Sequence, residues 1–153
     1  MSSVPLSYVM NLLARREYSE YEIYCKMQAK DFSEEEIKQT LTHCQQKNWQ
    51  NDRRFTENYI NSYAQRGYGR HRIRQELQHV KGISPEIIEE TLATCEIDWH
   101  DIVLSVLRKK YPDYRSKMDL KTKQKIWRYM LSRGFYTEEF SDLVNSKISA
   151  DSF

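Results

Sequence analysis

The 153-residue chain has few of the residues that interrupt regular structure or build cross-linked frameworks. It contains four glycines and three prolines, too few turn residues to separate the many short strands of an all-β protein. Its three cysteines, Cys25, Cys44 and Cys95, are odd in number and form no C-x-x-C pair, which is typical of reduced thiols in the cytoplasm. We interpret Cys44 and Cys95 as small core residues.

The chain also lacks the patterns of membrane insertion, export and metal binding. No run of about 18 apolar residues is present, so we predict no membrane span. No basic segment precedes a continuous apolar block near the N-terminus, so we predict no secretory signal and a cytoplasmic protein. The four histidines are scattered, with no carboxylate or thiolate at ligand spacing, and we therefore predict no metal site and no cofactor.

An excess of either charge is missing as well. Lys and Arg number 24 and Asp and Glu number 22, which leaves a net charge of +2. Only local charge could therefore support binding to nucleic acid. Hydrophobic residues make up 39% of the chain, which is polar for a globule, but 12% aromatic residues argue against disorder. This balance favours an elongated helical protein whose large side chains fill thin cores.

The most informative stretch of the sequence runs from Gln65 to Leu77. Two glycines flank Tyr68, and because glycine adopts positive φ at little cost, they predict a turn between two helices. After the turn, Ile73, Leu77 and Val80 follow at i, i+4 and i+7 and predict one apolar helix face. The arginines of this helix are expected on the opposite side, so that replacing two of them would remove charge without disturbing the core.

Local signals place further helices along the whole chain. Ser19 with Glu22 and Ser33 with Glu36 have the spacing of capping boxes, and Ser84-Pro85 predicts another helix start. Nine helices follow from these signals and from the apolar periodicity. We expect the first to run to about Arg16, Asp52 to cap the fourth, and the eighth to span 117–133 with Leu131 inside.

The helical registers repeat along the chain, which indicates internal repeats. Ile23 and Ile73 match at an offset of 50 residues, and Ile73 matches Ile126 at an offset of 53. We therefore predict an all-α fold, an elongated array of three tandem three-helix repeats. The first repeat covers residues 1–50, the second 51–97, and the third 98–153 with a short C-terminal tail from about Ser149.

Charge is segregated along this predicted array. Residues 83–102 contain six carboxylates and no Lys or Arg, whereas residues 108–128 contain nine Lys or Arg and two Asp. Helix starts favour carboxylates, but Glu96, Asp98 and Asp101 are expected to follow a helix and not to begin one. Lys117, Lys121 and Lys125 form either a solvated stripe or a basic ridge for a polyanion or an acidic partner surface.

The sequence resembles the RecX family of bacterial regulatory proteins over roughly residues 7–147. The residues that carry the resemblance are Asp52-Arg53-Arg54-Phe55, Gly67-Tyr68-Gly69, Arg72 to Leu77, Lys81-Gly82-Ile83-Ser84, Asp98-Trp99, Lys123 to Leu131 and Arg133-Gly134-Phe135. The opening segment Leu13 to Glu22 is also similar to the start of the family's sequences.

This resemblance implies a function in DNA repair, DNA recombination and the SOS response. It implies a regulator that binds the recombinase RecA and the RecA–DNA filament. Such a protein occupies the filament groove or blocks filament extension, and so modulates recombinase, ATPase and coprotease activities. We expect a monomer that binds free single- or double-stranded DNA only weakly. The expected partner-binding residues are Arg53, Arg66, Tyr68, Arg70, Arg72, Arg74, Lys117, Lys121, Lys125 and Arg128.

Two other classes of function are weighed against this interpretation. Three-helix units with a glycine turn before a basic helix can resemble helix-turn-helix DNA-binding modules, but no Asn or Gln cluster begins the helix to read adenine. An enzyme is not predicted, because the sequence shows no nucleophile–base pair, P-loop or zinc constellation and no catalytic residue. Trp99 is expected to be a wedge between the second and third repeats, in preference to a base-stacking residue.

Overall fold

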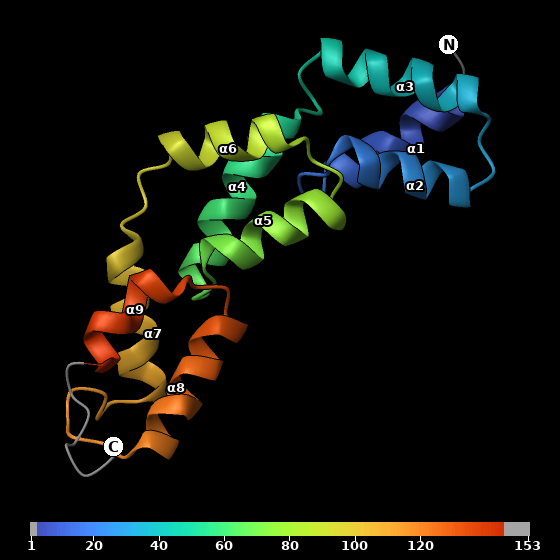
Figure 1. Ribbon diagram of the computed structural model, residues 1–153. Coiled ribbons are helices and arrows are strands. Elements are labelled where there is room, and N and C mark those ends of the chain that lie inside the picture. The colour runs from blue at the N-terminus through green and yellow to red at the C-terminus, as the bar shows by residue number, and fades with distance from the viewer. Residues whose placement is uncertain (1–2, 146–153) are drawn as a thin grey trace. The chain divides into compact units, whose positions relative to one another are not determined.

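The computed structural model describes residues 3–145, and within them the regular structure consists of nine α-helices and no β-strand (Figure 1). The predicted tail lies outside the described residues. The helices are α1 (Ser3–Leu13), α2 (Glu20–Ala29), α3 (Glu34–Gln46), α4 (Asp52–Gln65), α5 (Arg70–His79), α6 (Pro85–Thr94), α7 (Trp99–Lys110), α8 (Leu120–Ser132) and α9 (Thr137–Asn145). The all-α fold built from three-helix repeats is thereby confirmed; its elongated shape stays a prediction.

Side-chain caps begin several of these helices as the sequence predicts. The Ser19 side chain accepts a hydrogen bond from the Glu22 N–H at 3.1 Å, and Glu22 accepts one from the Ser19 N–H at 3.1 Å. Ser33 and Glu36 form the same reciprocal pair at the start of α3. Each pair satisfies two backbone donors that a helix start leaves free, which fixes where α2 and α3 begin. Ser84 caps α6, with Pro85 as its first residue.

Three helix boundaries differ from the prediction. Helix α1 ends at Leu13, before Arg16. Asp52 is the first residue of α4, and the cap is Asn51, whose side-chain oxygen accepts a hydrogen bond from the Arg54 N–H at 3.0 Å.

Helix α8 is shorter than predicted because Asp119 caps it. The Asp119 carboxylate accepts a hydrogen bond from the Thr122 N–H at 2.8 Å, which starts the helix at Leu120 and not at residue 117. Hydrogen bonds from the side chain and the backbone N–H of Thr122 hold the pKa of Asp119 below its ordinary value.

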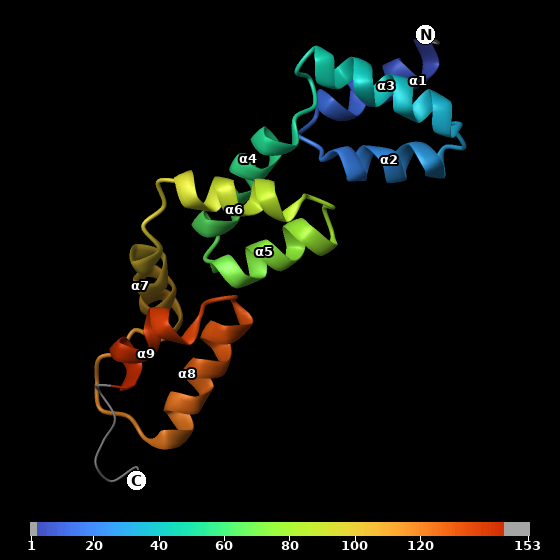
Figure 2. The same cartoon turned by 45° about the horizontal axis from the view of Figure 1, so that its top comes forward.

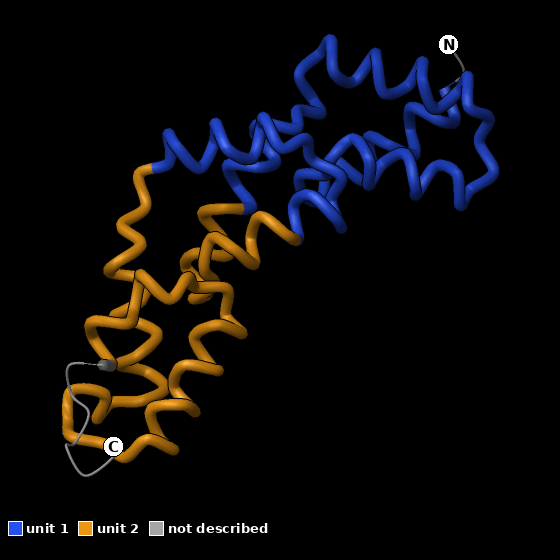
Figure 3. The backbone as a smooth tube through the Cα atoms, viewed as in Figure 1, with its two compact units in different colours: residues 1–59, 76–95 blue, residues 60–75, 96–153 orange. Residues whose placement is uncertain are grey.

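The helices gather into two compact units, whose boundaries fall inside α4, inside α5 and between α6 and α7 (Figure 3). The first unit comprises Met1–Tyr59 and Glu76–Cys95. The second unit comprises Ile60–Gln75 and Glu96–Phe153. The second predicted repeat therefore contributes to both units, which agrees with repeats that are too small to bury a core alone.

In the first unit, α1 and α2 both pack against α3 (Figure 2). Their contact buries one continuous cluster of side chains, Val9, Tyr18, Ile23, Met27, Ile37, Leu41 and Cys44. Burial raises the pKa of the Cys44 thiol, which agrees with its interpretation as a core residue. Cys95 differs from that interpretation, since it ends α6 and is only partly buried.

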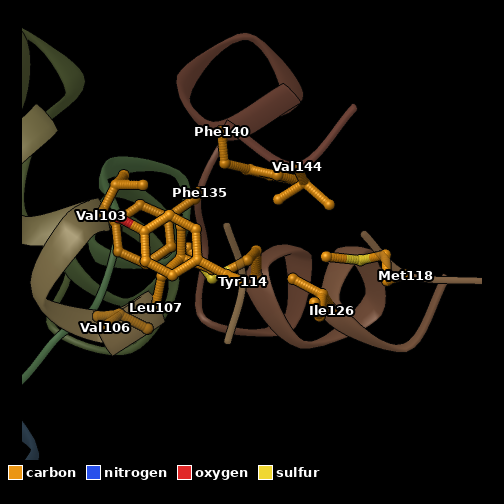
Figure 4. Close-up of a cluster of buried hydrophobic side chains, with 10 residues drawn as sticks. Val103, Val106, Leu107, Tyr114, Met118, Ile126, Phe135, Phe140 and Val144 are labelled. Atoms are coloured by element: carbon orange, nitrogen blue, oxygen red, sulfur yellow. The ribbon is translucent and has the colours of Figure 1, made fainter. Parts of the chain in front are cut away.

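In the second unit, α9 packs on both α7 and α8 over a cluster rich in large side chains (Figure 4). The cluster consists of Val103, Val106, Leu107, Tyr114, Met118, Ile126, Met130, Phe135, Phe140 and Val144. The indole ring of Trp127 packs edge-on against Phe140, with 5.1 Å between ring centroids. This core holds α7, α8 and α9 at fixed positions within the unit.

Two side chains that were expected inside are exposed. Val80 is 56% exposed, because α5 ends at His79 and the chain turns away before the next step of the period. Leu131 is 47% exposed, because the buried face of α8 runs through Ile126 and Met130 and the next residue points about 100° away. The periodicity of both helices is correct, and the errors concern one residue at each helix end.

We predict that Leu77→Ala lowers the free energy of unfolding by about 2–5 kcal/mol, since the Leu77 side chain is fully buried and its removal leaves a cavity. Chemical denaturation of the two proteins measures the difference. Val80→Ala in the same segment is the control and is expected to change stability little. Equal stability of Leu77→Ala and the parent chain would contradict the buried position.

Candidate partner-binding surface

The turn around Tyr68 lies directly against the turn that joins α8 to α9. The Gly69 N–H donates a hydrogen bond to the Arg133 carbonyl at 2.8 Å, and the His71 N–H donates one to the Gly134 carbonyl at 3.0 Å. A Cβ atom on Gly69 would lie 2.4 Å from the Gly134 oxygen, where no real side chain fits. Glycine is therefore required at position 69 because two backbones meet there.

Tyr68 occupies the centre of this contact. Two guanidinium groups stack on its ring, that of Arg72 at 4.4 Å and that of Arg133 at 4.0 Å from the ring centroid. Arg133 also donates hydrogen bonds to the carbonyls of Arg66 and Gly67 at the end of α4. Cations stabilise this end of a helix, and stacking of arginine on an aromatic face adds to the contact.

The arginines of α5 bind within the same unit, and the expectation that Arg70 and Arg74 stand on an outer face without structural contacts is wrong. Arg70 forms an ion pair with Glu139 at 3.0 Å, and its guanidinium lies 5.4 Å from the Trp99 ring. Arg74 donates a hydrogen bond to the Tyr136 hydroxyl at 2.6 Å. The reason is that this side of α5 meets the start of α9.

Arg72 and Trp99 complete the contact between the second and third repeats. Arg72 donates a hydrogen bond to the Ser132 carbonyl at 3.3 Å, near the end of α8. Trp99 begins α7 of the third repeat and lies under Arg70 of the second, at the junction where the sequence predicts a wedge.

An equivalent contact joins the first and second repeats inside the first unit. The Ser19 hydroxyl donates a hydrogen bond to the Lys81 carbonyl at 2.7 Å, as Gly69 donates to Arg133. Gly82 has a φ of +67°, and a Cβ atom there would lie 2.5 Å from the Tyr21 Cβ. The register repeat in the sequence therefore corresponds to a repeated contact, in which a turn of one repeat meets the second helix of the preceding repeat.

Glu22 holds two cations at this first contact. Its carboxylate accepts hydrogen bonds from Arg16 and from Lys81, each at 3.0 Å. Partial burial raises the pKa of Glu22, but the hydrogen bonds from Arg16, the Ser19 N–H and Lys81 outweigh it and hold the pKa below its ordinary value.

Two other expected partner-binding arginines lie nearer to solvent. Arg53 pairs with Glu90 at 2.8 Å, but both side chains are more than half exposed, so this pair contributes little to stability. Arg66 is exposed at the end of α4, with its guanidinium 4.8 Å from the Tyr63 ring.

The expected basic ridge lies on and just before α8. Lys121, Lys125 and Arg128 follow at i, i+4 and i+7 and are exposed, and Lys117 is exposed before the helix begins. Within residues 3–145, none of these four side chains forms an ion pair with a carboxylate. They are therefore available to a partner.

Part of the acidic segment has a local explanation, contrary to the expectation that these carboxylates follow a helix and do not begin one. Asp98 is the N-cap of α7 and accepts a hydrogen bond from the Asp101 N–H at 3.2 Å, and Asp101 lies in the first turn. Both carboxylates therefore favour a helix start, because only four residues separate the end of α6 from the start of α7. Of the three carboxylates, only Glu96 neither caps α7 nor lies in its first turn.

Three cations missed as site residues line a hollow in the second unit. Lys109, Lys110 and Arg133 surround a cavity of about 280 Å³ together with Arg66. The run Arg108-Lys109-Lys110 is the sequence signal for this hollow, but in the sequence it is only one part of the basic segment 108–128.

Two other kinds of site are absent from the part of the chain that the structure describes. No three His, Cys, Asp or Glu side chains there gather in a way that could hold a metal ion. No helix there is both long and apolar enough to cross a membrane.

Comparison with known proteins identifies the repeats. Residues 6–44, 51–92 and 96–143 match the models of the first, second and third three-helix domains of RecX, respectively. The first two matched ranges lie within the first two predicted repeats, and the third begins at residue 96, two residues before the predicted third repeat. The exact boundaries of the repeats stay predictions.

Full-length relatives and solved structures agree with these matches. The chain is 60% identical to the regulatory protein RecX of Mannheimia succiniciproducens over 95% of both chains. It is 62% identical to that of Pasteurella multocida, covering 94% of this chain and 88% of the relative. A crystal structure of regulatory protein RecX covers 94% of this chain and 71% of its own, with a TM-score of 0.78 at 19% identity. That of RecX from Lactobacillus salivarius covers 94% of both chains, with a TM-score of 0.74 at 19% identity.

We predict that Arg70→Ala combined with Arg74→Ala lowers the free energy of unfolding by about 2–4 kcal/mol. Hydrogen bonds to charged groups are worth roughly 1.5–3 kcal/mol each, and partial exposure reduces the sum. Lys121→Ala with Lys125→Ala is the matched control, since it removes the same charge from exposed positions and is expected to change stability by only about 0.5 kcal/mol. Urea denaturation compares both double variants with the parent, and equal stability of the arginine variant would contradict the structural contacts.

The stability of the first unit is expected to depend on the charge of Glu22. Because the pKa of Glu22 is lowered on folding, its stabilisation is present above the ordinary pKa of about 4.3 and is lost as the pH falls through the lower folded value. Glu22→Gln should therefore be less stable than the parent near neutral pH, with a smaller difference at about pH 3. Denaturation across this pH range measures the difference, with the exposed Glu20→Gln as control; a constant difference would contradict the linkage.

Proposed function

Because this chain belongs to the RecX family, we propose that it is a non-catalytic regulator that binds RecA and the RecA–DNA filament. In this role it occupies the filament groove or blocks filament extension, and thereby inhibits or modulates the recombinase, ATPase and coprotease activities of RecA. The protein acts in the cytoplasm as a monomer, in DNA repair, recombination and the SOS response.

The observation that carries this proposal is the match of all three repeats, in order, to the three RecX domains over residues 6–143. Relatives named regulatory protein RecX cover nearly the whole chain at 60% identity, so a regulatory role is supported for the chain as a whole. The direction of regulation, and RecA as the partner, come from the family resemblance.

The charge distribution of the described residues supports a partner of mixed charge. Exposed cations lie along α8, whereas α6 carries Glu86, Glu89 and Glu90 and no cation. A net charge of +2 gives little long-range attraction to bare DNA, whereas separate basic and acidic surfaces suit a groove formed by protein and DNA together. Lys117, Lys121, Lys125 and Arg128 are the proposed contacts that folding leaves available.

The alternative, a helix-turn-helix-like DNA-binding module, is less well supported. Such a module places its second or third helix in the major groove with side chains directed at base edges. The basic side chains of α5, which would have to read bases, contact Glu139, Ser132 and Tyr136 instead. Binding of α5 to a duplex would require these contacts to break.

We predict that the protein binds the assembled RecA–DNA filament more tightly than RecA alone or single-stranded DNA alone. The physical reason is that only the filament offers both charge types in one groove. Fluorescence anisotropy of the labelled protein, titrated with each target at matched salt, measures the three affinities. Inhibition of the DNA-dependent ATPase of RecA provides an independent readout.

Two results would count against the proposal. Tightest binding to bare DNA would reverse the expected order, and a clear preference for one duplex over scrambled duplexes would favour the helix-turn-helix alternative. Lys121→Ala with Lys125→Ala should weaken filament binding without changing the melting temperature, whereas an unchanged affinity would exclude the α8 ridge as a contact.

A further inference from the structure

A cavity in the second unit gathers positive charge from three helices. The end of α4 contributes Arg66, the last turn of α7 contributes Lys109 and Lys110, and the residue after α8 contributes Arg133. The cavity measures about 280 Å³, and no Asp or Glu lies in its wall. We propose that it binds a backbone phosphate of single-stranded nucleic acid.

The charges in this cavity lack protein counterions. Within residues 3–145, none of the four cationic side chains forms an ion pair with a carboxylate. Cations are common at helix ends, which explains why two lysines lie in the last turn of α7. It does not explain why they surround the same hollow as cations from two other elements, where like charges repel and an anion relieves the repulsion.

One of the cations is held in place before any ligand binds. Arg133 donates hydrogen bonds to the Arg66 and Gly67 carbonyls and stacks on Tyr68 at 4.0 Å. Gly67 has a φ of +86°, and a Cβ atom there would lie 2.9 Å from a Val106 methyl group in the same wall. This close approach of α4 to α7 sets the shape of the cavity, so part of the site is preorganised.

The lining favours a phosphodiester over other anions. The hydroxyl of Ser105 and the amide of Gln65 offer hydrogen-bond donors beside the cations, and lysine is a common phosphate ligand. Tyr129 adds an aromatic ring to the wall, 5.4 Å from the Lys110 ammonium. Cations beside an aromatic ring are typical of proteins that hold a single strand by its backbone and stack its bases. The volume admits a phosphate with part of its sugar, which a flat acidic protein surface would not fill.

This inference rests on the proposed function and extends it, because the filament presents a DNA strand. In the filament, the residues around the cavity contact the DNA backbone, and they are separate from the α8 ridge.

The test uses the full chain carrying Lys109→Ala and Lys110→Ala. Lys38→Ala with Lys47→Ala, at two exposed lysines of the first unit, is the matched control. Anisotropy of a labelled oligodeoxythymidylate at low salt measures binding. We expect a loss of about tenfold or more for the cavity variant and a slope of log K against log salt that is shallower by about 0.7, the value for one phosphate contact on a single strand. The control should bind within about twofold of the parent. Since Lys109 and Lys110 are exposed, as are the lysines of the control, both variants should have the same melting temperature as the parent.

Three other outcomes would contradict the cavity as the site that binds the strand. Equal losses in both double variants would show that general charge and not the cavity binds the strand, and an unchanged affinity of the cavity variant would overturn the site. Displacement of the oligonucleotide by a nucleoside triphosphate at equal phosphate concentration would assign the cavity to free nucleotide. Arg66 lines the same cavity from the end of α4, so Arg66→Gln should also weaken binding. It provides a second variant if the lysine variant is unstable.

Parallel assays of RecA ATPase inhibition separate this inference from the proposed function. A parent chain that inhibits RecA but binds no oligonucleotide would overturn the cavity proposal alone. A parent chain that binds the oligonucleotide through the cavity but leaves RecA unaffected would overturn the proposed function alone.

Discussion

The close contact between the backbones of successive repeats is the constraint on which the structure depends. In the second unit, the turn at Gly69 meets the turn at Gly134. A hydrogen bond of 2.8 Å joins the Gly69 N–H to the carbonyl of Arg133, the residue before Gly134. In the first unit, the Ser19 hydroxyl supplies the equivalent donor to the Lys81 carbonyl. Each three-helix repeat has a thin core, so the repeats gain stability by satisfying the polar groups of their neighbours.

This contact also determines which charges remain for a partner. The guanidinium groups of Arg70, Arg72 and Arg74 surround the junction and bind groups of the third repeat, so they lock the backbones in register. The lysines of α8 and those around the cavity have no such role within the described residues. A basic side chain near a repeat junction thus stabilises the fold, whereas one away from it can serve binding. Helices α5 and α8 are both rich in basic residues, yet the arginines of α5 stabilise the junction and the ridge on α8 can serve binding.

Much of the fold follows from local signals, and much of the site does not. The caps at Ser19, Ser33 and Ser84 act within three residues, and the period of each apolar face is set by the helix itself, so both can be read from the sequence. The partner of Arg70 lies 69 residues away at Glu139, and nothing near Arg70 in the chain indicates it. The cavity likewise joins residues from the ends of three helices. Its cations could be counted in the sequence, but their convergence depends on tertiary packing.

The turn of the first repeat shows what the backbone contact demands. Asp31 occupies the position that corresponds to Gly82 and Gly134, and it has the same left-handed backbone, with a φ of +64°. Its side chain is exposed, whereas Gly82 and Gly134 meet a neighbouring side chain or backbone within 2.5 Å of an added Cβ. The three repeats are therefore not interchangeable modules: a chain rebuilt with the first repeat in second or third place would bring a carboxylate where only hydrogen fits. The side chain of Asp31 thus restricts the first repeat to the first place in the array.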